Sequence, residues 1–169
     1  MSTDAADRPA DAFLGLLDQP VYVVTAEADG TRAGCLVGFG SQCSIRPLRF
    51  AVWLSPENRT HRVACRAFAL GVHLLPPDDA GRALATLFGG SSGDDIDKFS
   101  RASWHLGPYG VPVLTGAAAW FVGRVVGRAE GGDHTAFLLE PVTGGGAALL
   151  PLSVLDQRAV ARVDPGHPA

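Results

Sequence analysis

The sequence predicts a mainly β protein, in the form of a β-barrel with helical insertions. Most apolar residues fall in short β-branched or aromatic segments, and 21 glycines and 12 prolines separate those segments. At 169 residues, of which 47% are hydrophobic and 18% charged, the chain is long enough for one ordinary domain with a single core.

Short strands are predicted along most of the chain. The first, at 21–25, is followed by the turn residues Ala28-Asp29-Gly30 and forms a hairpin with a second strand at 32–37. Two late strands are separated by another turn at 130–133. The other predicted strands are 50–54, 68–75, 117–126 and 135–139.

Helical segments are few. We expect a flexible N-terminal tail at 1–12 and a single domain over 13–169 that opens with one helical turn. Asn58 or Thr60 is placed to cap a helix that runs to Ala67, because both side chains accept hydrogen bonds from free N–H groups. The next helix opens at Asp78 and ends in Gly89–Gly93, and its apolar face consists of Ala80, Leu84, Leu87 and Phe88. A long loop that carries 97–99 and 108–112 is expected after it.

Charge and composition exclude several classes of function. The net charge of -3 argues against a nucleic-acid binder, which usually has a basic excess. The polar, acidic start is no secretory signal, and no apolar run approaches the ~18 to 20 residues of a membrane span. Cys35, Cys43 and Cys65 have no CxxC spacing, as expected for reduced thiols. We therefore expect a cytoplasmic protein that binds neither nucleic acid nor membrane.

Common catalytic motifs are absent from the sequence. It contains no GxSxG, no HExxH and no Cys/His cluster with metal spacing, so neither a hydrolase nor a metal site is expected. The glycine pairs at 38–40 and 144–146 do not complete GxGxxG between a strand and a helix. A Rossmann dinucleotide site is therefore not expected either.

Two segments have the residue types of a ligand site. From 33 to 47 a strand passes into small and hydroxylated residues, which let a flat ligand or a phosphate approach the backbone. These residues are equally compatible with a β-bulge and a loop without a ligand. From 55 to 62, hydroxyls and two arginines surround a helix start, which suits either an anion site or plain N-capping with solvated arginines.

In combination, these segments resemble the flavin reductase-like family of FMN-binding split barrels, which includes the small reductase partners of two-component monooxygenases. The resemblance extends from Val21 to about Val142. Its blocks are Val23-Val24-Thr25 with Ala33-Gly34; Gly38 to Pro47 leading into Phe50 to Ser55; Asn58-Arg59-Thr60; and Asp97-Lys98-Phe99 followed by Gly110 to Leu114 and Gly132 to Thr135. It implies an antiparallel, Greek-key-like split β-barrel with peripheral α-helices, and a homodimer with flavin near the interface.

The resemblance also assigns site residues. It puts the flavin ring beside the strand-to-loop segment and the ribityl-phosphate tail beside the hydroxyls that follow. The cofactor-binding residues it implies are Gly34, Cys35, Leu36 and Val37 near the ring, Gly38, Phe39, Ser41, Gln42 and Ser44 nearer the tail, and Ser55, Asn58, Arg59 and Thr60 for the second segment. Many members have paired serines where this chain has Gly38-Phe39, so two hydroxyls are missing here.

His134 is the candidate catalytic residue. From the residues alone, a histidine after Gly-Asp is either a turn residue bonded to backbone or part of a site. The resemblance implies that it faces the flavin and binds the nicotinamide, and that the loop of Lys98 and Phe99 lies near the pocket or a dimer contact.

The implied activity is transfer of hydride from NAD(P)H to FMN, or to FAD, which supplies reduced flavin to a separate monooxygenase. The alternatives are an FMN-binding oxygenase of the same fold, a non-enzymatic flavin or electron carrier, and a relative without any ligand.

Overall fold

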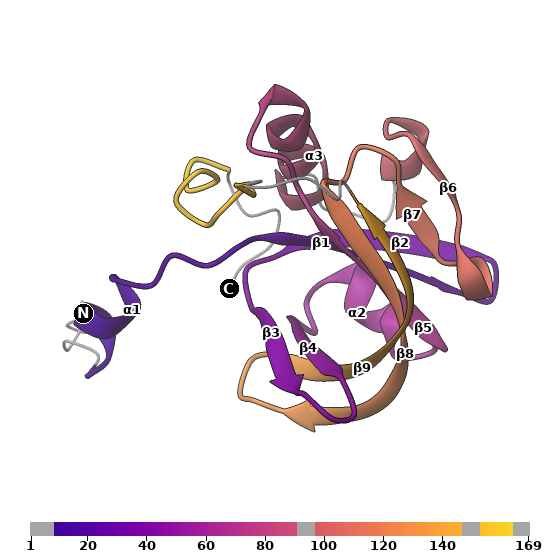
Figure 1. Cartoon of the computed structure of the whole chain (residues 1–169), viewed down its shortest axis with the longest axis horizontal. Coiled ribbons are helices and arrows are strands. Elements are labelled where there is room, and N and C mark those ends of the chain that lie inside the picture. The colour runs from indigo at the N-terminus through magenta and orange to yellow at the C-terminus, as the bar shows by residue number, and fades with distance from the viewer. Residues whose placement is uncertain (1–8, 91–96, 147–152, 164–169) are drawn as a thin grey trace, which may run out of the picture.

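The structure, a computed structural model, describes residues 9–90, 97–146 and 153–163. Strands dominate these residues, and the helices are few and short (Figure 1). The elements are α1 (Asp11–Leu14), β1 (Tyr22–Ala28), β2 (Thr31–Val37), β3 (Gly40–Ser44), β4 (Arg49–Leu54), α2 (Arg59–Ala64), β5 (Ala69–Leu74), α3 (Asp79–Gly90), η1 (Lys98–Ser100), β6 (Trp104–Leu106), η2 (Pro108–Gly110), β7 (Pro112–Leu114), β8 (Ala119–Glu130) and β9 (Thr135–Gly146).

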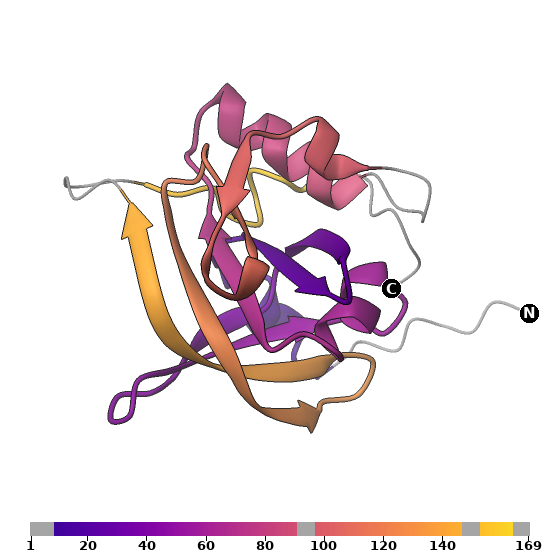
Figure 2. The ribbon, with the colours of Figure 1, turned by 90° about the vertical axis from the view of Figure 1, so that its right-hand side faces the viewer.

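Seven strands form one antiparallel sheet, in the order β2-β1-β5-β8-β9-β4-β3. β8 and β9 have 12 residues each and bend around the molecule (Figures 1 and 2). Their pairing shifts register at Val122/Gly123 and at Val125/Gly127, and such bulges increase the local twist of a sheet. The sheet therefore curls into a barrel whose edge strands, β2 and β3, are consecutive in the chain. The predicted mainly β, split-barrel class is confirmed.

β1 is buried on both faces. Tyr22 and Val24 point into the barrel core, together with Val63 and Ala64 of α2. Val21 and Val23, on the alternate face, pack in a second cluster that contains Phe88 of α3 (Figure 2). α3 thus lies against the outside of the barrel, while α2 contributes to its inside.

His73 joins the sheet to the small β6–β7 hairpin. Its side chain is fully buried; Nε2 accepts a hydrogen bond from the Leu114 N–H at 3.1 Å, and Nδ1 therefore donates to the Val23 carbonyl at 2.9 Å. Burial lowers the pKa of His73 to about 4, which is consistent with this neutral form.

The predicted hairpin is confirmed: β1 pairs with β2, and Asp29 (φ 53°) and Gly30 (φ 77°) supply the left-handed turn conformations. The six predicted strands are all present, although β8 and β9 each extend well beyond their predicted ends. Asn58 caps α2, since its Oδ1 accepts from the Thr60 N–H at 2.9 Å.

Other expectations need correction. β3 was not among the predicted strands, and the segment from 97 to 114 contains β6, β7 and two 3-10 turns instead of one long loop. Ala80 is exposed, whereas Phe88 of the same helix is buried. α1 begins at Asp11, inside the predicted tail, and residues 1–8 and 91–93 lie outside the described part of the chain. Within the described residues, no helix is long and apolar enough to cross a membrane.

Candidate functional site

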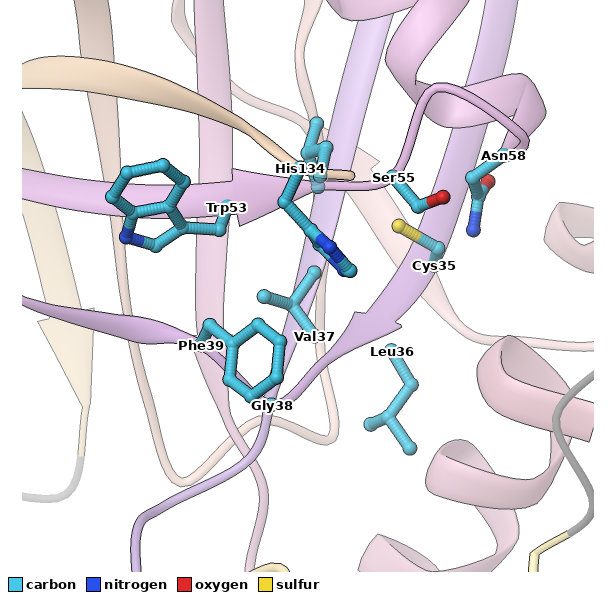
Figure 3. A pocket seen from close by; sticks show the side chains of 10 residues that line it. Cys35, Leu36, Val37, Gly38, Phe39, Trp53, Ser55, Asn58 and His134 are labelled. Atoms are coloured by element: carbon cyan, nitrogen blue, oxygen red, sulfur yellow. The ribbon is translucent and has the colours of Figure 1, made fainter. Parts of the chain in front are cut away.

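A pocket lies where the chain passes from one edge of the sheet to the other (Figure 3). Its volume is about 130 Å³. The walls come from the end of β2, the link to β3, the end of β4, the loop before α2, and the turn between β8 and β9. The lining residues are Cys35, Leu36, Val37, Gly38, Phe39, Trp53, Leu54, Ser55, Asn58 and His134.

The peptide groups of Leu36 face outward from the edge of the sheet. Val23 pairs with Leu36 on one side and with His73 on the other. The Val23 carbonyl accepts from the His73 ring, so it points toward β5 and away from β2. When two residues lie opposite each other in an antiparallel pair, their N–H and C=O groups either all point toward the partner strand or all point away from it. Because the Val23 carbonyl points away from β2, the N–H and C=O of Leu36 point away from β1. Because β2 is an edge strand, its outward N–H and C=O meet no neighbouring strand.

Two other residues near this edge, Gly34 and Gly38, also have carbonyls that point away from β1. The carbonyl of Gly34, two residues before Leu36, accepts from Lys98 Nζ at 3.2 Å. The carbonyl of Gly38, two residues after it, accepts from Gln157 Nε2 at 2.5 Å. Both donors lie outside the sheet, as the register requires. The pocket therefore presents a strand edge on which the flanking carbonyls are bonded and the Leu36 peptide groups face outward.

Aromatic rings occupy one side of the pocket. The rings of His134 and Phe39 meet edge to face, with centroids 5.2 Å apart. His134 Nδ1 lies 2.7 Å from Asp133 Oδ1, and this hydrogen bond lowers the pKa of the Asp133 carboxyl. Trp53 supports the turn that carries His134, because Gly131 lies so close to the indole that a Cβ there would collide with it. The turn is thus fixed over the pocket by packing.

The polar groups at the other end of the pocket are uncharged. Ser55 Oγ accepts from the Glu57 N–H at 3.3 Å, and Asn58 Oδ1 caps α2, so the amide of Asn58 keeps its two donors. Cys35 lines the same pocket (Figure 3). Burial raises the pKa of the Cys35 thiol to about 11, outweighing a hydrogen bond to Thr60 and the Lys98 charge, so the thiol is neutral at pH 7.

The structure brings together most of the residues predicted for the site. Eight of the predicted residues line the pocket: Cys35, Leu36, Val37, Gly38, Phe39, Ser55, Asn58 and His134. His134 bonds to the neighbouring carboxylate and faces the pocket, which favours the site interpretation over a turn residue bonded to backbone. Lys98 also lies beside the pocket wall, through its bond to Gly34.

Six predicted residues do not line this pocket. Gly34 packs instead against Phe88 and Phe99. The remaining five lie on neighbouring elements. Ser41, Gln42 and Ser44 belong to β3 and lie along its pairing with β4. Thr60 is buried in α2, where it forms a hydrogen bond with Cys35, and Arg59 begins α2 and interacts with other groups of the chain. Trp53 and Leu54, which the sequence places in a strand and not in the site, also line the pocket. Their position directly before Ser55 is the signal that could have identified them.

The curled sheet and this pocket define a flavin reductase-like protein. A family profile described as "Flavin reductase like domain" matches residues 14–156, so the chain belongs to that family. The chain is 32% identical over 127 residues to the ferric-chelate reductase (NAD(P)H) of Archaeoglobus fulgidus, covering 72% of each chain. It is 33% identical over 143 residues to FMN reductase (NADH) RutF of Ancylobacter novellus, covering 82% of this chain and 75% of the relative.

A solved structure confirms the fold. The NADH:FAD oxidoreductase SgcE6 of Streptomyces globisporus superposes with a TM-score of 0.77 at 24% identity, covering 88% of this chain and 89% of the other. Family and relatives together make the chain an oxidoreductase of the flavin-reducing class.

Proposed function

We propose that the chain is an NAD(P)H-dependent flavin reductase that binds FMN in this pocket. A relative named FMN reductase (NADH) supports the choice of cofactor and of nicotinamide. The observation that carries the proposal is the Leu36 peptide, which faces outward on a sheet edge inside an uncharged pocket. Such an edge accepts a planar ligand with its own donors and acceptors, as it would accept another strand.

The pocket residues fit a flavin. The pyrimidine edge of a flavin carries carbonyl oxygens and an N–H, and the Leu36 peptide offers one donor and one acceptor to it. Leu36, Val37 and Phe39 supply apolar surface for the ring, while Ser55 and Asn58 offer neutral donors for the more polar part of the molecule. No Asp, Glu, Lys or Arg lines this pocket, so no fixed charge opposes the uncharged ring.

A bound flavin supplies the two-electron chemistry, because it accepts hydride from a dihydronicotinamide. The chain contributes binding and orientation. His134 Nδ1–H donates to Asp133, which leaves Nε2 to form a hydrogen bond with the carboxamide of a nicotinamide. This role requires no proton transfer by His134, since hydride transfer depends mainly on how the two rings are placed.

A homodimer and a monooxygenase partner belong to the same proposal. The pocket volume of about 130 Å³ is below the ~300–1,000 Å³ of most small-molecule sites, so a flavin extends beyond its walls. A second copy of the chain can cover the remainder. Reduced flavin released from such a site would then serve a separate monooxygenase. Light scattering at high micromolar concentration tests the dimer, and a monomeric mass would contradict it.

Anaerobic mixing tests the central activity. Protein, FMN and NADH or NADPH are combined without oxygen, and loss of the flavin absorption band is followed with time. We expect bleaching with at least one nicotinamide. Binding of FMN without reduction by either nicotinamide would indicate an electron carrier and contradict the proposal, and so would the absence of flavin binding.

Two variants test the Leu36 edge. Leu36→Pro removes the outward N–H, and proline is tolerated on strand edges that make no ladder bond. Leu36→Val, the matched control, keeps both peptide groups. Loss of one hydrogen bond should weaken FMN binding by about 1 kcal/mol, roughly fivefold, in the proline variant alone. Equal affinities in two folded variants would remove the Leu36 N–H from the site.

A further inference from the structure

The segment that follows the family match reaches the pocket. The match ends at residue 156, and Gln157 is the next residue. Leu155 is buried; its carbonyl accepts from the Val21 N–H at 3.0 Å and its N–H donates to the Leu75 carbonyl at 2.9 Å. The Gln157 N–H donates to the Gln19 carbonyl at 3.0 Å. These bonds place the side chain of Gln157 beside the end of β2.

The Gln157 amide fastens one peptide of the pocket wall. Its Nε2 donates to the Gly38 carbonyl at 2.5 Å, across 119 positions of sequence. A Cβ at Gly38 would lie 3.1 Å from the same nitrogen, so the glycine permits the close approach. The Gly38 carbonyl and the Phe39 N–H belong to one planar trans peptide and point in opposite directions. Holding the carbonyl on the C-terminal segment therefore also sets the direction of the Phe39 N–H and the start of Phe39.

Lys98 makes the equivalent contact on the other side of Leu36. Its Nζ donates to the carbonyls of Gly34 (3.2 Å) and Phe88 (3.0 Å). Two side chains from distant parts of the chain thus bond the carbonyls on either side of Leu36. Of the three carbonyls of Gly34, Leu36 and Gly38, the one of Leu36 is thus the one that neither Lys98 nor Gln157 occupies.

We propose that Gln157 is a positioning residue for the flavin, an inference that rests on the proposed function. By bonding the Gly38 carbonyl it fixes the end of β2, so that the ring meets the Leu36 peptide in a single orientation. Gln157 acts through Gly38 and Phe39 and contributes no group to the reaction.

Substitution of Gln157 tests this role. Gln157→Met keeps the length of the side chain and removes the donor, and Arg158→Ala alters the same segment without touching Gly38. We expect Gln157→Met to weaken FMN and riboflavin equally, by about three- to tenfold, because the effect acts on the ring and not on the phosphate. The visible circular dichroism of bound flavin should change, and Arg158→Ala should change neither readout.

Gln157→Glu adds a pH-dependent readout. Above the pKa of the new carboxyl it repels the Gly38 carbonyl, and below that pKa its O–H donates again. The affinity of this variant for FMN should therefore be lower than that of the wild type at pH 8 and approach it as the pH falls to about 4, below the ordinary glutamate pKa of about 4.3. A merely structural role predicts a lower melting temperature for both Gln157 variants and no pH dependence of the flavin affinity of the folded protein.

Amide hydrogen exchange separates this inference from the proposed function. In flavin-free protein, Gln157→Met should speed exchange at residues 36–40, where Arg158→Ala should not. If wild-type protein binds no flavin, the proposed function fails while the exchange experiment still tests the hold on Gly38. Unchanged exchange in Gln157→Met, or flavin affinities within twofold of wild type with an unchanged dichroism spectrum, would overturn the inference.

Discussion

His73 makes the stability of the fold dependent on pH. Burial is the main reason that its pKa falls from the ordinary 6.5 to about 4. Between these two values the unfolded chain binds a proton that the folded chain does not, so the free energy of unfolding falls as the pH falls. The stabilisation is fully present above pH 6.5. At about 1.4 kcal/mol per unit, it decreases by about 3 kcal/mol as the pH approaches 4.

Urea unfolding between pH 7 and pH 4 measures this contribution. His73→Asn removes the titration and leaves the Leu114 N–H, 3.1 Å from Nε2 in the wild type, without its acceptor. At pH 7 the variant should therefore be less stable by about 1–3 kcal/mol. This difference should shrink toward pH 4, because the wild type loses the His73 term and the variant does not.

A histidine on the surface provides the matched control. His105 is exposed and is only the last of the contributors that lower the pKa of His73, so His105→Asn should change the dependence of stability on pH far less than His73→Asn does. If His73→Asn and the wild type lose stability in parallel from pH 6.5 to pH 4, His73 is protonated in the folded state as well, and the reasoning from its burial is wrong.

Three further predictions concern the pocket. His134→Ala should leave FMN affinity nearly unchanged and weaken nicotinamide binding by ~1–2 kcal/mol in stopped-flow reduction; early melting with normal reduction by the folded fraction would instead indicate a turn residue. Gly131→Ala should push the turn away from Trp53, lower the free energy of unfolding by ~1–3 kcal/mol and raise the KM for nicotinamide. Adding Trp53→Leu to this variant should restore the stability and the KM. Riboflavin should bind more weakly than FMN by ~1.5–3 kcal/mol for each phosphate bond made by the segment from Ser55 to Thr60; equal affinities would place the phosphate in solvent.

The strands of the core were predictable because their signal is local. The segments at 21–25 and 50–54 are β-branched or aromatic and bounded by turn residues, and each becomes a strand close to its predicted position. β3 has the composition Gly-Ser-Gln-Cys-Ser and lies mostly exposed at a sheet edge. No apolar alternation identifies such a strand, because its position depends on pairing with β4 and not on burial of its side chains.

Much of the site was predictable for a similar reason. The residues from Cys35 to Phe39 are consecutive, so all of them line the pocket once the segment passes along its wall. The hydroxyls at 41–44 were expected to follow into the site, but pairing with β4 leads them along β3 and out of the pocket. Trp53 has the local appearance of a core residue, and only the packing of Gly131 against its ring reveals its place beside His134.

The sequence by itself determined the class of fold, the first hairpin, the capped start of α2 and the family, because each depends on residue types within short segments or on the order of such segments. The tertiary structure decided which strand lies at the edge of the sheet, and thereby that the Leu36 peptide faces outward. It also decided that Lys98 and Gln157 bond the carbonyls on either side of that peptide. Those contacts join residues far apart in the chain, and pairing order and packing, which no local pattern encodes, place them together.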